Sequence, residues 1–188
     1  MPNLYMLLIG CSPPGRNIEQ HDVYFGIGEN LRDVIPYAVD FWPGGGKIHF
    51  DAWRKVHKVN EFEVTVITGS QPQNTYQLFF LNLGGYKPDE FEEFHYKMIV
   101  AAKDKSEAIR IAKQTAFYKH TGFKGAPSHI DDKYGIDVDD VYAVSDILDP
   151  HMKGQYFISV QPAPINLYED EIHLGYFRID KVNQWAAE

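Results

Sequence analysis

The chain resembles itself at a distance of about 75 residues, and this internal repeat limits the folds that it can adopt. Residues 4–30 align with residues 78–104 without a gap. Identical residues recur at corresponding positions: Gly10 and Gly84, Pro14 and Pro88, Glu19 and Glu93, His21 and His95. Further along, residues 49–51 match residues 129–131 after small insertions in loop-like stretches. Matches that keep their order across such insertions predict two diverged copies of one unit.

Each copy predicts the same order of elements, β-β-α-β. The first apolar run, at 4–10 or 77–83, is short enough for a buried strand. The second run, at 21–27 or 95–101, is rich in the β-branched and aromatic residues that favour strands. A helix follows, then a loop with a His-x-Asp segment where a short extra strand can form, and a final strand at 62–67 or 141–145.

The two predicted helices differ in how they begin. In the second copy, Asp104 and Glu107 fit a capping-box pattern, apolar residues continue at helical spacing to Ala116, and Gly122 is placed to end the helix. In the first copy the helix lies around residues 30–42 and contains Pro36. A proline inside a helix predicts either a kink or a regular start delayed to about Asp33.

These patterns together predict an α+β fold with a mainly antiparallel sheet. The tandem units, residues 1–70 and 75–150, are expected to pack with approximate two-fold symmetry, and residues 151–188 to form a C-terminal β-hairpin. Pairing of edge strands between duplicated units covers edges that otherwise promote aggregation. Edges that remain open, or the tail hairpin, predict self-association into a homo-oligomer.

Composition excludes several classes of protein. An apolar fraction of 44% and a charged fraction of 23% are those of a globular domain. The formal net charge of −8 argues against binding to nucleic acid or to anionic membranes. No apolar run approaches the roughly 20 residues of a membrane span. Cys11 is the single cysteine, which excludes an internal disulfide and predicts a reducing compartment, the cytoplasm.

Several strings of residues resemble the bacterial family called domain of unknown function 1543. They are residues 19–28, 45–54, 80–86, 91–97 and 112–135, so that the resemblance extends over roughly residues 4–150. It implies membership of a small family in which the unit occurs once or twice. The resemblance assigns no reaction, cofactor or catalytic residue.

The repeated polar residues form a Glu-x-His pair and a His-x-Asp pair in each copy. They are Glu19, His21, His49 and Asp51 in the first copy, and Glu93, His95, His129 and Asp131 in the second. Residues i and i+2 of a strand point to the same face, so each pair can aim two polar groups at one spot. Two imidazoles and two carboxylates suit zinc, manganese or iron, with His21, His49 and Asp51 as metal ligands. They also suit general acid/base chemistry.

A purely structural role explains the same residues, because a carboxylate that hydrogen-bonds a histidine can tie a loop to a sheet edge. On this basis we expect a non-enzymatic binding or interaction protein, with no cofactor assigned and with its ligand or partner unidentified. The alternative is a metal-dependent enzyme of hydrolase type that uses one of the two clusters. The enzyme predicts that His21 and His49 reach one accessible metal, whereas the structural role predicts burial or bonds to loop backbone.

Overall fold

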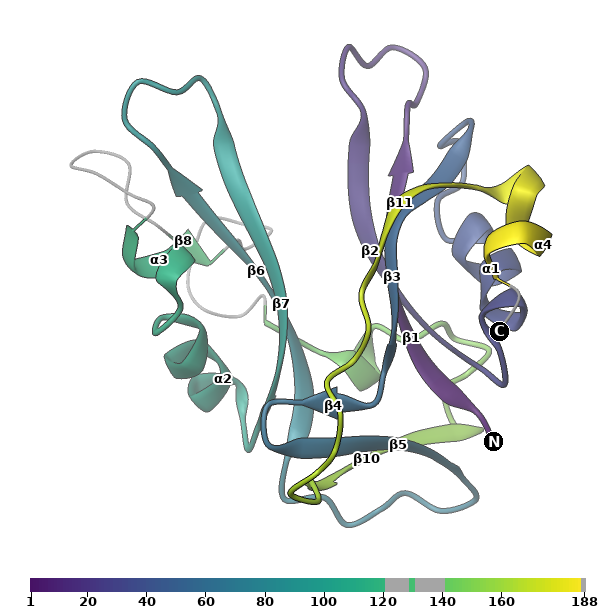
Figure 1. The fold of residues 1–188 in the computed structure, drawn as a ribbon, viewed down its shortest axis with the longest axis vertical. Coiled ribbons are helices and arrows are strands. Elements are labelled where there is room, and N and C mark those ends of the chain that lie inside the picture. The colour runs from purple at the N-terminus through teal and green to yellow at the C-terminus, as the bar shows by residue number, and fades with distance from the viewer. Residues whose placement is uncertain (121–128, 131–140, 187–188) are drawn as a thin grey trace. The chain divides into compact units, whose positions relative to one another are not determined.

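The computed structural model describes residues 1–120, 129–130 and 141–186 (Figure 1). The chain divides into two compact units, and the second is inserted into the first. The first unit contains residues 1–72 and 148–188, and the second contains residues 73–147. The C-terminal segment, predicted as a separate extension, therefore belongs to the first unit.

The first unit is built on two antiparallel sheets. One has the strand order β11-β3-β1-β2, and the other has the order β10-β5-β4. The strands are β1 (Asn3–Cys11), β2 (Gln20–Gly28), β3 (Ile48–Val56), β4 (Lys58–Val59), β5 (Phe62–Thr68), β10 (Tyr156–Pro162) and β11 (His173–Arg178). The predicted short strand at His49 is thus a full strand of nine residues, because it pairs with β1 on one side and β11 on the other.

One face of the four-stranded sheet is covered by α1 (Leu31–Asp40) and by the C-terminal η2 (Ile179–Lys181) and α4 (Val182–Trp185). Of the two alternatives predicted for Pro36, a kink or a delayed start, the delayed start is wrong, because α1 already begins at Leu31 and contains Pro36. The Asp33 carboxylate accepts the backbone N–H of Asn30 at 3.0 Å, which stabilises the first turn. The core below α1 consists of buried residues from the sheet and helix: Tyr5, Leu7, Ile9, Tyr24, Leu31, Val34, Ile35, Ala38, Phe50 and Trp53.

The second unit has the strand order β7-β6-β8, and β9 also pairs with β6. Its elements are β6 (Gln77–Tyr86), β7 (Glu93–Ala102), α2 (Lys105–Ala112), α3 (Ala116–His120), β8 (His129–Ile130), β9 (Tyr142–Ala143) and η1 (Val144–Asp146). The helix predicted to continue past Ala112 is interrupted there. Thr115 accounts for the break, because its hydroxyl donates to the Ala112 carbonyl and accepts the N–H of Tyr118. Gly122, predicted to end the helix, lies outside the described residues.

No described helix is long and apolar enough to cross a lipid bilayer.

The strand registers of the two units correspond. In the first unit, Gly10 of β1 lies opposite His21 of β2 and His49 of β3. In the second, Gly84 of β6 lies opposite the backbone of His95 in β7 and His129 in β8. Each glycine is therefore flanked by two histidine positions.

Residues 151–188 do not form the predicted hairpin. β10 pairs with β5, and β11 pairs with β3, so the two strands lie in different sheets. Both β5 and β3 offer an edge with backbone groups to satisfy, and each strand of the tail pairs with one of these edges instead of with the other. The mixed α+β character and the mainly antiparallel sheets are as predicted.

Candidate metal centre

Three neighbouring strands bring the polar residues of the first copy together. β1 is the central strand at this point, and Gly10 pairs with His21 on one side and with His49 on the other. Residues directly opposite each other in antiparallel strands project to the same face. The imidazoles of His21 and His49 therefore rise on either side of Gly10, and Glu19 lies two residues before His21 on that face.

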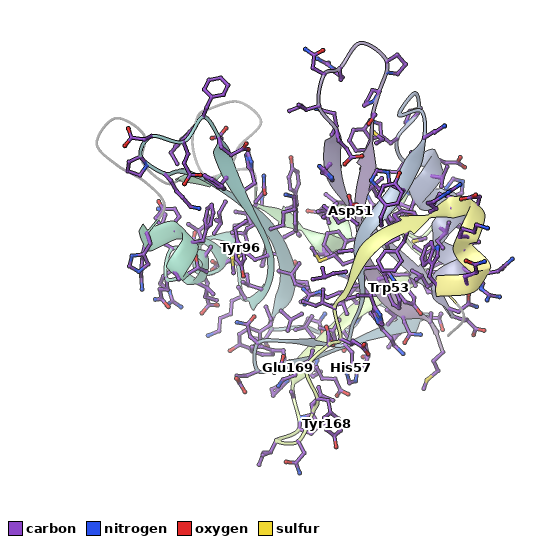
Figure 2. All side chains as sticks on the ribbon, turned by 45° about the horizontal axis from the view of Figure 1, so that its top comes forward. Asp51, Trp53, His57, Tyr96, Tyr168 and Glu169 are labelled. Atoms are coloured by element: carbon purple, nitrogen blue, oxygen red, sulfur yellow. The ribbon has the colours of Figure 1, made fainter. Side chains whose placement is uncertain are left out.

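A β-bulge in β3 adds the fourth group. Ile9 pairs with Phe50 and Leu8 pairs with Ala52, so Asp51 is one extra residue in β3. Because of this extra residue, both Phe50 and Trp53 face the core although they are three residues apart. His49 and Asp51 remain together on the opposite face. Figure 2 labels Asp51 and Trp53 on this strand.

The four side chains converge on one small volume. Nε2 of His49 lies 3.2 Å from Oε1 of Glu19 and 3.3 Å from Oδ1 of Asp51. Nε2 of His21 lies 3.0 Å from Oδ2 of Asp51 and 3.5 Å from Oε2 of Glu19. Each carboxylate thus approaches both imidazoles. Donor atoms of Glu19, His49 and Asp51 form the compact group, since all three lie within 4.8 Å of one another.

Burial decreases from one side of the cluster to the other. The side chain of His49 is 3% exposed, that of Asp51 is 26% exposed, and those of His21 and Glu19 are 38% and 39% exposed. Both ring nitrogens of His49 and Oδ2 of Asp51 are buried without a hydrogen-bond partner among the described residues. The short distances therefore do not correspond to well-aligned hydrogen bonds. A buried polar atom without a partner costs about 1–3 kcal/mol.

The spacing of these atoms fits a bound cation. Two atoms that ligate one tetrahedral ion at about 2.0–2.1 Å lie about 3.3–3.4 Å apart. The separations of 3.2 and 3.3 Å between His49 and the two carboxylates match this edge length. Glu19, His49 and Asp51 could hold the ion, and His21 contacts both carboxylates from the exposed side.

Gly10 forms the floor of the cluster, a role that the sequence reasoning missed. A Cβ at this position would lie 2.4 Å from His49 Nε2 and 2.7 Å from Asp51 Oδ2. Any side chain at position 10 would therefore occupy the space of the ligating atoms. The repeat contained a signal for this role, because Gly10 matches Gly84 and a repeated glycine at a strand end indicates a close approach.

Tyr176 of β11 is the second residue that the sequence reasoning missed. Its ring centroid lies 4.1 Å from that of His49, with an angle of 32° between the ring planes. No pattern in the sequence connected the C-terminal segment with the repeated histidines.

The cluster of the second copy is described only in part. The Glu93 carboxylate accepts a hydrogen bond from the Tyr86 hydroxyl at 2.5 Å. His95 is exposed on β7, the backbone of His129 lies in β8, and Asp131 lies outside the described residues.

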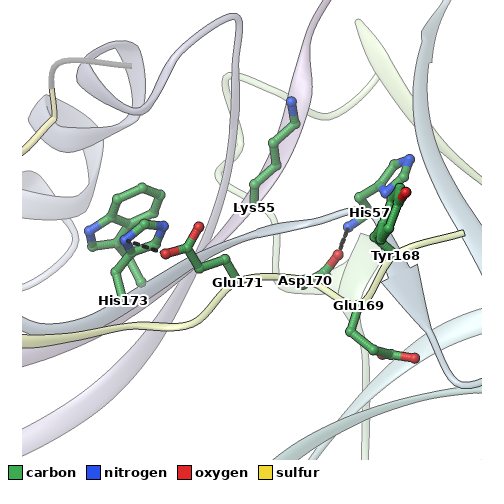
Figure 3. A pocket seen from close by; sticks show the side chains of 8 residues that line it. Lys55, His57, Tyr168, Glu169, Asp170, Glu171 and His173 are labelled. Carbon is green, nitrogen blue, oxygen red and sulfur yellow. Dashed lines mark hydrogen bonds and ion pairs between the residues drawn. The ribbon is translucent and has the colours of Figure 1, made fainter.

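A cavity of about 340 Å³ lies elsewhere in the first unit (Figure 3). Its acidic side chains already have partners. The Asp170 carboxylate accepts the backbone N–H groups of His57 and Lys58, Glu169 contacts the Lys58 ammonium, and Glu171 lies 4.0 Å from His173. These contacts fix the C-terminal segment to β3 and β4.

Cys11 is buried next to the site but on the core side of β1. Burial raises the pKa of its thiol, and the negative charge of Glu19 raises this pKa further. A thiol with a raised pKa is a poor nucleophile. Cys11 is therefore a poor candidate for a nucleophile at this site.

Comparison with solved structures identifies a protein of the same fold. The crystal structure of a protein Il1583 from Idiomarina loihiensis superimposes with a TM-score of 0.61 over 95% of this chain and 99% of that chain, at 16% sequence identity. At this identity the likeness shows the fold alone. No curated protein matches the sequence.

The family resemblance expected from the sequence is confirmed for the first unit. The matching segment extends from the loop before β2 into β5, and it contains Glu19, His21, His49 and Asp51. The match does not extend to the second copy. Residues 16–66 match the model of the family described as Domain of Unknown Function (DUF1543).

Proposed function

We propose that the first unit binds a divalent metal ion through Glu19, His49 and Asp51. The observation that carries this proposal is a His49 Nε2 that is buried, has no hydrogen-bond partner among the described residues, and lies from the Glu19 and Asp51 oxygens at the edge lengths of a tetrahedral ion, with all three ligand atoms within 4.8 Å of one another. Imidazole and carboxylate ligands suit zinc, manganese and iron. The chain is then a binding protein whose ligand is the metal.

Metal binding is tested by titrating the purified protein with zinc in competition with a chromophoric chelator. We expect about one equivalent of tight sites in the wild-type protein, and loss of these sites in His49→Ala. His57→Ala is the matched control, because His57 also lies near a carboxylate, 3.8 Å from Glu63, but away from the cluster. Absence of binding to the wild-type protein, or unchanged binding to His49→Ala, would disprove the proposal.

A second candidate is the metal-dependent hydrolase, and the exposure of the cluster favours it. Three protein ligands leave a fourth position for water or substrate, as in catalytic zinc sites. Glu19 and His21 lie at the solvent side of the cluster, where solvent has access to this position. Such an ion, when bound, would supply Lewis-acid activation of water, and His21, beside the Asp51 carboxylate, would be placed to accept a proton.

The hydrolase is tested by assaying the zinc-loaded and metal-free protein with simple carboxylic and phosphoric esters. Turnover should require the metal and should fall in His21→Gln while zinc affinity is largely kept. A zinc-loaded protein without turnover on either class of ester would leave metal binding as the function.

We also infer that the two units descend from one ancestral unit. The corresponding registers at Gly10 and Gly84 support this origin, since each glycine lies opposite two histidine positions in the same arrangement of strands.

A further inference from the structure

Among the described residues, His49 has no partner for the hydrogen bond that usually orients a metal-binding histidine. A ligating histidine generally donates its second ring N–H to a carboxylate, a carbonyl or a water. Nδ1 of His49 is buried and has no such partner among the described residues. Within the described part of the chain, packing against neighbouring groups is therefore what restrains this imidazole.

Two residues on the neighbouring strands supply this packing. β3 lies between β1 and β11 in the sheet. On the β1 side, the imidazole lies directly against the backbone of Gly10. On the β11 side, the ring of Tyr176 lies over it with a centroid separation of 4.1 Å. Gly10 and Tyr176 thus restrict the ring from both sides.

The position of Tyr176 depends on an irregularity in β11. Leu174 pairs with Ala52 and Phe177 pairs with Phe50, which leaves one more residue in β11 than in β3 between these pairs. Gly175 has φ +154°, a conformation that other residues rarely adopt. The strand is held on both sides of this irregularity. His173 stacks on Trp53 with a centroid separation of 3.7 Å, and Phe177 packs on Trp185.

Burial does not explain why a large aromatic residue stands at position 176. Tyr176 is 65% exposed, so it contributes little to the core, yet its ring covers a histidine that is only 3% exposed. We propose that Tyr176 is a positioning residue that holds the His49 imidazole in place for the metal. The irregular strand β11 places the Tyr176 ring against this imidazole. This inference rests on the proposed metal site and assigns part of that site to the C-terminal segment.

The test compares the zinc affinity of three variants with that of the wild-type protein. Tyr176→Ala should weaken binding on the order of 10-fold, which is the lower range for residues that support a ligand. Tyr176→Phe should bind as the wild type does, because the stacked ring is kept. Leu174→Ala is the matched control: Leu174 lies on the same strand, is 76% exposed, and should not affect the affinity.

A second measurement separates positioning from general destabilisation. The d–d absorption spectrum of bound cobalt reports the ligand geometry, so it should change in Tyr176→Ala and not in Leu174→Ala. Wild-type affinity and spectrum in Tyr176→Ala would disprove the inference and leave the metal site standing. Weak binding in Tyr176→Phe equal to that in Tyr176→Ala would also disprove it, since the hydroxyl and not the packing would then act. A wild-type protein that binds no metal would refute the proposed function, and this inference with it.

Discussion

Substitution of Gly10 by alanine is the most direct test of the cluster geometry. The added Cβ would lie 2.4 Å from His49 Nε2 and 2.8 Å from its Cε1, whereas ordinary van der Waals contact begins at 3.4 Å. The imidazole would have to move by about 1 Å, since the backbone of β1 is fixed by pairing on both sides. Overpacking of this kind costs about 1–3 kcal/mol of the free energy of unfolding.

The effect on metal binding should exceed the effect on stability. Metal–ligand distances tolerate changes of only about 0.2 Å. A displacement of about 1 Å therefore removes His49 from the coordination sphere. Loss of a direct ligand should weaken zinc binding by at least the roughly 10- to 100-fold found when a supporting residue is removed.

Gly26→Ala is the matched control for this experiment. A Cβ at Gly26 would lie 2.3 Å from a methyl group of Val34, so the overlap is similar but falls on the core face of the same sheet. Both variants are measured by urea denaturation of the metal-free protein and by zinc competition titration. Both should lose stability, and only Gly10→Ala should lose zinc affinity.

Equal zinc affinities for Gly10→Ala and the wild-type protein would refute the reasoning. An equal loss of affinity in Gly26→Ala would refute it as well, because destabilisation alone would then explain the result. A double-mutant cycle with His49→Ala adds a further check. Gly10→Ala should cost less stability when the imidazole is absent, since its main steric conflict is removed.

Three further predictions concern stability, each measured by chemical denaturation. Asp170→Ala removes a carboxylate that accepts two successive backbone N–H groups at the start of β4, and it should lower the free energy of unfolding by about 1–3 kcal/mol. A loss of stability no larger than that caused by an exposed Glu→Ala change would contradict this. Burial and the nearby Asp149 carboxylate raise the pKa of the Tyr24 phenol, so the native state keeps this proton above pH 10 while the unfolded state loses it. Stability should therefore fall as the pH rises above about 10, by up to about 1.4 kcal/mol per pH unit from this group, and Tyr24→Phe should reduce that slope; an identical slope would show that other groups cause it. Asp104→Ala removes the acceptor for the Glu107 N–H at the start of α2 and should cost about 1 kcal/mol, whereas Asp104→Ser should keep most of the stability.

Features encoded by short-range patterns were predictable from the sequence. The apolar runs of β1 and β6 and the cap of α2 at Asp104 were confirmed. The i, i+2 spacing predicted that each of the pairs Glu19/His21 and His49/Asp51 can share a face, but not that β2 and β3 lie on either side of β1 and bring the two pairs together.

Features that depend on distant partners were not predictable. β10 and β11 were expected to pair with each other, but each pairs with an edge strand more than 80 residues away in sequence. No local pattern distinguishes these two outcomes, because a strand with exposed backbone groups pairs equally well with either neighbour. For the same reason Tyr176 could not be connected with His49, which lies in a strand from the opposite end of the chain.

The extra residue at Asp51 divides β3 into two stretches, and the alternation of side chains between the two faces of the sheet changes phase between them. Before this point the odd-numbered residue His49 faces the cluster, and after it the odd-numbered residue Trp53 faces the core. Substitutions in either stretch can accumulate independently, because each stretch keeps its own alternation. A deletion of one residue between Phe50 and Trp53 would restore regular alternation and keep both on the core face, but it would remove the bulge that places Asp51 in the cluster. Relatives that share this centre should therefore vary in composition along β3 but keep the spacing of three residues between the core positions Phe50 and Trp53.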